Sequence, residues 1–217
     1  MRKYKYVLFD LDGTISDPKI GITKSFQYAL QHLGIEVEDL DELEPVIGPP
    51  LKDSFMEFYH LTEEQAMVGI EKYRERFSVK GWCENTIYPG MKELLEELAK
   101  EGCKLAIASS KPTVFVEQIC DYFEITPYFS YRIGSFLDGK RGTKDQVVEE
   151  AIRLLGGEES KKDMVMIGDR KFDVLGGHAH NLPVIGVSFG YGGREELQEA
   201  GADWIADSVE ELRRYLL

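Results

Sequence analysis

The chain has 217 residues, of which 43% are apolar and 30% are charged. This composition is typical of a folded globular protein, and the length allows one large domain or a main domain with a smaller insertion. No apolar run reaches the roughly 18 to 20 residues that a membrane helix needs. The formal charge of -13 repels polyanions, so neither a nucleic acid polymer nor a membrane is an expected partner.

Short apolar runs predict the strands of a buried parallel sheet. They lie at Tyr6–Phe9, Lys104–Ala108, Met164–Gly168 and Pro183–Val187. Amphipathic stretches predict helices over Met91–Lys100, from Pro112 onward, from a Thr143/Gln146 capping box to Gly156, over Arg194–Ala200 and over Val209–Leu216. Strands that alternate with helices favour right-handed βαβ units. The expected fold is therefore α/β, with a doubly wound, mostly parallel, Rossmann-like sheet.

The segment that follows the first strand interrupts this alternation. A helical stripe from Ile22 to Leu33 ends at Gly34, the stretch Leu51–Phe77 reads as helix, and no strand is predicted between Ser16 and Thr86. We therefore expect residues 16–86 to form an all-helical cap domain. It would be inserted into a core domain made of residues 1–15 and 87–217.

The three cysteines, Cys83, Cys103 and Cys120, are an odd number at spacings that fit neither a disulfide framework nor a zinc site. Reduced thiols favour a cytoplasmic protein. The sequence does not decide between a monomer and a homodimer.

Polar clusters follow three of the predicted strands. Asp10-Leu11-Asp12-Gly13-Thr14 follows the first, Ser109-Ser110-Lys111 the second, and Gly168-Asp169 with Asp173 the third. In an open α/β sheet, ligands bind at the carboxyl ends of the strands, so the three clusters are expected to converge. Isolated Asp and Ser residues at strand ends are often only turn formers or helix caps, but three such clusters together favour a functional site.

The residue types in these clusters indicate the chemistry. Several carboxylates without a histidine or thiol pattern favour a hard cation such as Mg²⁺ over zinc. Asp10 and Asp12 lie two residues apart on an extended backbone, so their side chains point in opposite directions. One carboxylate can then attack a phosphorus atom as a nucleophile while the other acts as general acid and base.

These three clusters, together with Lys144 between the second and the third, resemble in their order the four motifs of the haloacid dehalogenase (HAD) superfamily. The resemblance implies that Asp10 is the nucleophile, that Asp12 protonates the leaving oxygen and later activates water, and that Thr14 supports the loop. It further implies that Ser109 hydrogen-bonds the phosphoryl group, next to Ser110, and that Lys144 balances its charge. Mg²⁺ would be held by Asp10, the backbone carbonyl of Asp12, Asp169 and the supporting Asp173.

Two longer stretches narrow the resemblance. Ile133–Lys144 and Gly168–Asp173 are similar to a branch of the superfamily labelled 5'-nucleotidase-like, with phosphoglycolate phosphatases and β-phosphoglucomutases as neighbouring branches. Within the expected cap, Lys52 follows Gly48-Pro49-Pro50 and is the residue most readily placed over a substrate, although a solvated lysine is the simpler interpretation.

The sequence thus predicts a phosphoric monoester hydrolase that uses Mg²⁺ and an aspartyl-phosphate intermediate. Its substrate would be a small soluble phosphomonoester, such as a nucleotide 5'-monophosphate or phosphoglycolate. A sugar phosphomutase of the β-phosphoglucomutase type is the nearest alternative, because it shares the aspartyl phosphate. A receiver-like phosphorylation switch is a further alternative, but it has no need for the general acid Asp12.

Overall fold

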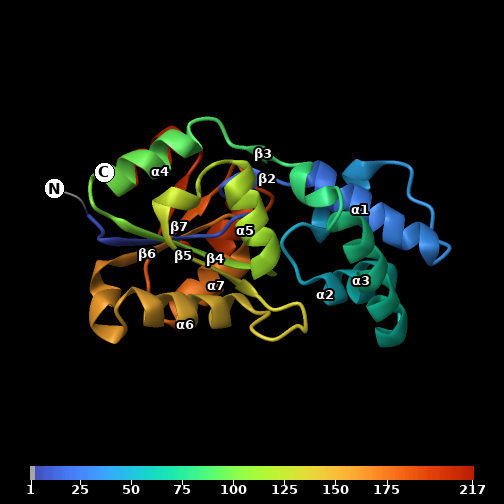
Figure 1. The fold of residues 1–217 in the computed structure, drawn as a ribbon. Helices are drawn as coiled ribbons and strands as arrows, with labels where there is room; N and C mark the ends of the chain where they lie inside the picture. The colour runs from blue at the N-terminus through green and yellow to red at the C-terminus, as the bar shows by residue number, and fades with distance from the viewer. Residues whose placement is uncertain (1–2) are drawn as a thin grey trace. The chain divides into compact units, whose positions relative to one another are not determined.

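The computed structural model describes residues 3–217 and divides the chain into two compact units (Figure 1). One unit contains the chain up to Asp17 together with Ile87–Leu217, and we call it the core unit. The other, Pro18–Thr86, is the helical unit. In the described residues, no helix is both long enough and apolar enough to cross a membrane.

A six-stranded sheet forms the centre of the core unit. Its strands are paired in the order β5-β4-β1-β6-β7-β8, and every neighbouring pair is parallel. The strands are β1 Tyr6–Phe9, β4 Lys104–Pro112, β5 Phe129–Ser135, β6 Met164–Gly168, β7 Val184–Val187 and β8 Trp204–Ala206. The predicted α/β fold is confirmed, and the four predicted strands are the four inner strands. The edge strands β5 and β8 were not predicted.

Helices cover both faces of this sheet, and in Figure 1 α4 and α6 lie on opposite faces. Helix α6 begins with the predicted capping box, in which Thr143 and Gln146 each bond to the other's backbone. The apolar sides of α6 and α7 pack on Leu8, Ala106 and Met166 in one buried cluster. The helices of the core unit are α4 Met91–Lys100, α5 Thr113–Tyr122, α6 Lys144–Leu155, α7 Lys171–Ala179, α8 Gly193–Glu199 and α9 Val209–Leu216, with short 3-10 turns at η3 Thr126–Tyr128 and η4 Glu158–Asp163.

The register of the central strands aligns their carboxyl ends. Phe9, the last residue of β1, pairs with Ile107 of β4 on one side and with Ile167 of β6 on the other. The backbone N–H of Asp10 then donates to the carbonyl of Ile167 at 2.9 Å. The segments that come after these paired positions in β1, β4 and β6 therefore meet at the carboxyl end of the sheet.

The helical unit contains α1 Lys19–His32, η1 Leu40–Val46, α2 Leu51–Tyr59, α3 Glu63–Phe77 and η2 Gly81–Cys83. The stretch Leu51–Phe77 is helical as predicted but forms two helices, because His60 adopts a left-handed conformation with φ 53° and ends α2. Thr62 then opens α3 with a capping box to Gln65. Two short strands, β2 Ser16–Asp17 and β3 Thr86–Ile87, form a two-stranded sheet where the chain leaves and re-enters the core unit, although no strand was predicted in this segment.

Candidate active site

The loop after β1 makes a tight turn that brings Asp10 and Asp12 to the end of the sheet. The N–H of Gly13 donates to the carbonyl of Ser16 at 2.8 Å, and Gly13 has a φ of +79°. A Cβ atom on Gly13 would lie only 2.1 Å from Oδ2 of Asp169. Only glycine fits this turn, because both the backbone conformation and the close approach exclude a side chain.

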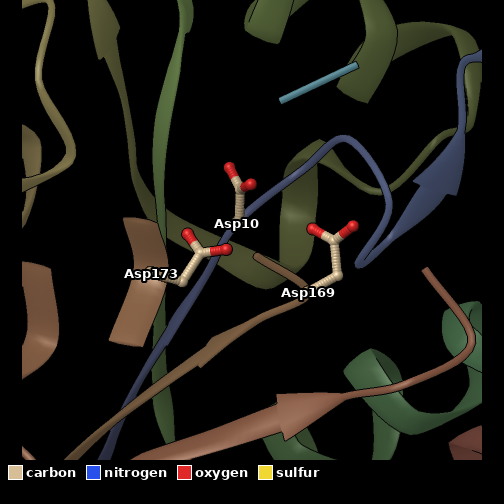
Figure 2. A group of neighbouring side chains, drawn as sticks. All are labelled: Asp10, Asp169 and Asp173. Atoms are coloured by element: carbon tan, nitrogen blue, oxygen red, sulfur yellow. The ribbon is translucent and has the colours of Figure 1, made fainter. Parts of the chain in front are cut away.

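Three carboxylates from different elements come together beside this turn (Figure 2). Asp10 follows β1, Asp169 follows β6, and Asp173 lies in the first turn of α7. One oxygen of each lies within 4.8 Å of the others, and the three residues are 8%, 0% and 1% exposed. The structure thus brings together three acids that are up to 163 positions apart in the sequence, from 10 to 173.

Lys144, the first residue of α6, supplies positive charge to this group. Its Nζ lies 2.8 Å from Oδ1 of Asp10 and 2.8 Å from Oδ1 of Asp173, and it donates to the carbonyl of Ala108 at 3.0 Å. Burial alone would lower the pKa of Lys144, but Asp10 and Asp173 raise it above its usual value. The ammonium group therefore stays charged inside the protein.

Hydrogen bonds from two backbone N–H groups and one hydroxyl further orient Asp169 and Asp173. Oδ2 of Asp169 accepts from the N–H of Tyr191 at 2.8 Å, and Oδ1 accepts from the hydroxyl of Thr14 at 3.4 Å. Oδ2 of Asp173 accepts from the N–H of Arg170 at 3.0 Å. Burial raises the pKa of Asp169 well above its ordinary value, and it raises the pKa of Asp173 to about 6.

This group of residues fits a divalent cation. One lysine cannot balance three buried carboxylates, and the Lys144 ammonium is already shared between Oδ1 of Asp10 and Oδ1 of Asp173. An oxygen-only donor set is the type that Mg²⁺ prefers. The buried acids and their raised pKa values are consistent with a site that needs a cation to become fully ionised.

Asp12 lies apart from this group and is paired with a second lysine. Its Oδ2 lies 2.6 Å from Nζ of Lys111, at the end of β4, whereas its Oδ1 is buried without a hydrogen-bond partner. Burial raises the pKa of Asp12 despite this lysine. The sequence interpretation gave Lys111 no role. Counting charges could have found it, since the acids at the end of β1 need more than one cation.

The two predicted serines occupy different places on the same strand. Ser109 is buried, and its hydroxyl accepts from the N–H of Lys111 at 3.4 Å. Ser110 is half-buried, and its carbonyl accepts from the hydroxyl of Ser135 at 2.8 Å. Lys52 belongs to the helical unit, where it forms an exposed ion pair with Glu63 at 2.6 Å.

A glycine-rich loop after β7 is the second feature that sequence reasoning missed. A Cβ atom on Gly190 would lie 2.3 Å from the carbonyl oxygen of Gly13 and 2.4 Å from Cβ of Asp169. The next residue, Tyr191, bonds to Asp169 through its N–H and to the Asp17 carboxylate through its hydroxyl. The sequence did indicate this loop, because the glycine-rich stretch Gly190-Tyr191-Gly192-Gly193 closely follows the predicted strand Pro183–Val187.

Comparisons with known proteins agree with this geometry. Residues 7–187 match the family model described as haloacid dehalogenase-like hydrolase. A 5'-nucleotidase of Pseudomonas aeruginosa is 43% identical over 197 residues, which are 90% of this chain and 88% of that protein. The tyrosine-protein kinase PtkA of Mycobacterium tuberculosis is 34% identical over 97% of this chain and 72% of its own length.

Solved structures give the same assignment. The crystal structure of a predicted phosphatase from Clostridium acetobutylicum is 49% identical and superposes with a TM-score of 0.94, covering 97% of each chain. The match to the family model spans most of the chain, from β1 to the end of β7. The resemblance found in the sequence motifs is therefore confirmed, and the chain belongs to the haloacid dehalogenase-like hydrolase family.

Proposed function

We propose that this protein is a Mg²⁺-dependent phosphatase that hydrolyses a small phosphomonoester through an aspartyl-phosphate intermediate on Asp10. The observation that carries the proposal is the buried group of Asp10, Asp169 and Asp173 around Lys144, with Asp12 two residues from Asp10. The family match and the relatives named as phosphatases support a phosphoric monoester hydrolase.

The residues of the site can divide the reaction into two displacements. A carboxylate oxygen of Asp10 forms a bond to phosphorus while the bond between phosphorus and the leaving oxygen breaks, and Asp12 gives its proton to that oxygen. Water then attacks the phosphorus of the acyl phosphate, Asp12 takes a proton from this water, and phosphate leaves with the Asp10 carboxylate restored. The hydroxyl of Ser109 would donate to a phosphoryl oxygen, and Thr14 would keep Asp169 in place.

The charge of the phosphoryl group must be balanced for Asp10 to attack it. Lys144 would supply one positive charge, already held 2.8 Å from Oδ1 of Asp10. Asp10, Asp169 and the supporting Asp173 would hold Mg²⁺ with the backbone carbonyl of Asp12, and the ion would contribute electrostatic stabilisation of the phosphoryl group. Hydrolysis of phosphate monoesters is among the slowest uncatalysed reactions, with enzymatic accelerations up to about 10²¹-fold, so this stabilisation has to be large.

For the substrate, we propose a nucleotide 5'-monophosphate ahead of phosphoglycolate. The relative named 5'-nucleotidase is 43% identical, whereas a relative named phosphoglycolate phosphatase, from Vibrio parahaemolyticus, is 28% identical. We assign substrate selection to the helical insertion, predicted as residues 16–86, as a cap with Lys52 as one contact. The ranking of kcat/KM over nucleotides, phosphoglycolate and sugar phosphates tests this order directly.

Replacing Asp10 by Asn tests the proposed reaction. The change keeps the size of the side chain but removes the nucleophile, so Mg²⁺-dependent release of phosphate from 4-nitrophenyl phosphate is expected to fall by at least about 10⁴-fold. Asp138→Asn, in an exposed turn, is the matched control and should retain activity. Undiminished turnover by the Asp10 variant would refute the proposal, and isomerised sugar phosphate in place of free phosphate would favour the phosphomutase.

A further inference from the structure

The ion pair between Lys111 and Asp12 has no role in the mechanism described so far. We propose that Lys111 is a positioning residue that holds one oxygen of Asp12, so that the other oxygen is the one that exchanges a proton with the leaving group and with water. This inference rests on the proposed phosphatase function and adds a residue to it.

The two oxygens of Asp12 have different surroundings. Oδ2 lies 2.6 Å from Nζ of Lys111, and the two side chains are only 13% and 6% exposed. Oδ1 is buried and has no hydrogen-bond partner in the protein. A short contact between charged groups in a buried setting is strong enough to fix the rotation of a carboxyl group. The pairing therefore leaves Oδ1 as the oxygen available for proton transfer.

The backbone of Lys111 is itself held firmly by strand β5. On one side, the hydroxyl of Ser135 donates to the carbonyl of Ser110 at 2.8 Å. On the other, the hydroxyl of Thr113 donates to the carbonyl of Ser135 at 3.2 Å and accepts from the N–H of Gly134 at 3.2 Å. A Cβ atom on Gly134 would lie 2.3 Å from the carbonyl oxygen of Lys111, so the two strands approach closely there. Lys111 therefore lies between two positions of the chain that are hydrogen-bonded to β5.

The consequence for the reaction is specific to the proton-transfer steps. When the bond between phosphorus and the leaving oxygen breaks, the proton moves from Oδ1 of Asp12 to that oxygen, and the negative charge left on Asp12 stays beside the Lys111 ammonium. In the second displacement the proton returns to Asp12 from the attacking water. Lys111 keeps its own protons throughout. Its removal should therefore matter most when the leaving oxygen needs a proton.

Two substrates with different leaving groups distinguish a role of Lys111 in protonating the leaving oxygen from a role that affects all substrates alike. The leaving group of 4-nitrophenyl phosphate departs as a stable phenolate, whereas a nucleoside 5'-monophosphate releases an alcohol that must be protonated. General acid catalysis contributes typically 10²–10⁴-fold, and kcat/KM reports only the steps up to formation of the aspartyl phosphate, so we expect Lys111→Met to lower kcat/KM by about 100-fold for the nucleotide. For the aryl ester we expect kcat/KM to fall by less than about 10-fold. Lys104→Met, at the other end of β4, is the matched control and should change neither value.

Further variants show whether Lys111 acts through Asp12. Asp12→Asn should change the two substrates in the same unequal way, and the double variant of Lys111→Met with Asp12→Asn should lose no more activity than Asp12→Asn alone. Lys111→Arg, which keeps the charge, should recover part of the activity on the nucleotide. Release of one equivalent of 4-nitrophenolate in a single turnover shows that the variants are folded.

The failures of the two proposals can be told apart. If the unmodified protein has no Mg²⁺-dependent activity on either ester, the proposed function is wrong and this inference with it. If the unmodified protein is active, two results would overturn the inference alone. These are equal losses of kcat/KM on both esters and additive losses of kcat/KM in the double variant.

Discussion

The core unit and the helical unit differ in the polar side chains that they bury, which include charged groups in the core unit and, in the part of the chain that the structure describes, only uncharged groups in the helical unit. Among residues 3–217, the buried charged side chains, Asp10, Lys144, Asp169 and Asp173, all belong to the core unit. The interior of the helical unit is aromatic instead, with the rings of Phe26 and Phe55 stacked at 4.1 Å. In the core unit, the charged side chains whose burial reduces stability lie together at the carboxyl end of the sheet.

The buried hydroxyl side chains of the helical unit, among the described residues, are satisfied locally. The hydroxyls of Thr23 and Ser25 each donate at 2.7 Å to a backbone carbonyl four positions earlier, and Ser54 does so at 3.3 Å. In the core unit, by contrast, charged groups are buried: Oδ1 of Asp10 is paired with Lys144, and Asp12 is paired with Lys111 through Oδ2 while its Oδ1 has no hydrogen-bond partner. Burying charged groups carries a desolvation cost, and such groups occur where function requires them. The comparison therefore locates the chemistry in the core unit.

Removing one lysine from each unit should give the largest difference in stability. Lys144→Met leaves Asp10 and Asp173 buried without their cation, so the free energy of unfolding at pH 7 without Mg²⁺ should fall by about 3–5 kcal/mol. Lys19→Met breaks more exposed pairs with Asp41 and Glu44 and should cost no more than about 1 kcal/mol. Urea denaturation measures both values, and equal losses would contradict the comparison.

Two carboxylates, one in each unit, should contribute to the pH dependence of stability with opposite signs. In the Mg²⁺-free core unit, burial raises the pKa of Asp173 to about 6, above the ordinary value near 3.9 in the unfolded chain. The folded state then holds the proton on Asp173 between these values, so the contribution of Asp173 to stability should fall, by on the order of 3 kcal/mol, as the pH rises from about 4 to above 6. In the helical unit, hydrogen bonds from Lys72 and Tyr28 lower the pKa of Glu75, which favours folding as the pH rises.

Urea titrations at a series of pH values, without Mg²⁺, measure this dependence. Asp173→Asn should reduce the fall in stability with rising pH, because the titrating group is gone. An identical pH dependence in the unmodified protein and in Asp173→Asn would show that burial does not raise the pKa of Asp173.

Mg²⁺ should stabilise the core unit selectively. Binding to the folded state at 100 times the dissociation constant adds about 2.7 kcal/mol, which raises the melting temperature of a domain of this size by about 5–10 °C. Asp169→Asn should abolish the increase, whereas Glu64→Gln, on the surface of the helical unit, should leave it unchanged. Calorimetry with Mg²⁺ and with a chelator measures both, and an increase that survives Asp169→Asn would place the ion elsewhere.

The inner part of the fold could be predicted because its strands are continuous apolar runs. The edge strand β5 could not, since Ser130 and Tyr131 are exposed and interrupt its apolar pattern. Strand β8 has only three residues. The break between α2 and α3 depends on a left-handed His60, a conformation that no glycine or proline indicates there. However, Thr62 and Gln65 are a readable capping box, so the start of α3 was available in the sequence.

The candidate site was predicted to a different extent. The convergence of Asp10, Asp169 and Asp173 follows from their positions just after two predicted strands, because parallel strands carry their carboxyl ends on the same side of the sheet. The pairing of Asp12 with Lys111 does not, since it depends on the path of β4 beyond Ala108 and on the close approach of Gly134. The sequence pattern identifies the acidic residues of the site, whereas the three-dimensional packing determines which lysine each of them pairs with.

The central claim is that Asp10 carries the phosphoryl group during turnover, and chemical trapping tests it most directly. Borohydride reduces an aspartyl phosphate to homoserine, so the protein is treated during turnover of 4-nitrophenyl phosphate and its peptides are analysed by mass spectrometry. We expect homoserine at position 10, dependent on both substrate and Mg²⁺. Homoserine at a different aspartate, or steady turnover with position 10 always unmodified, would contradict the account.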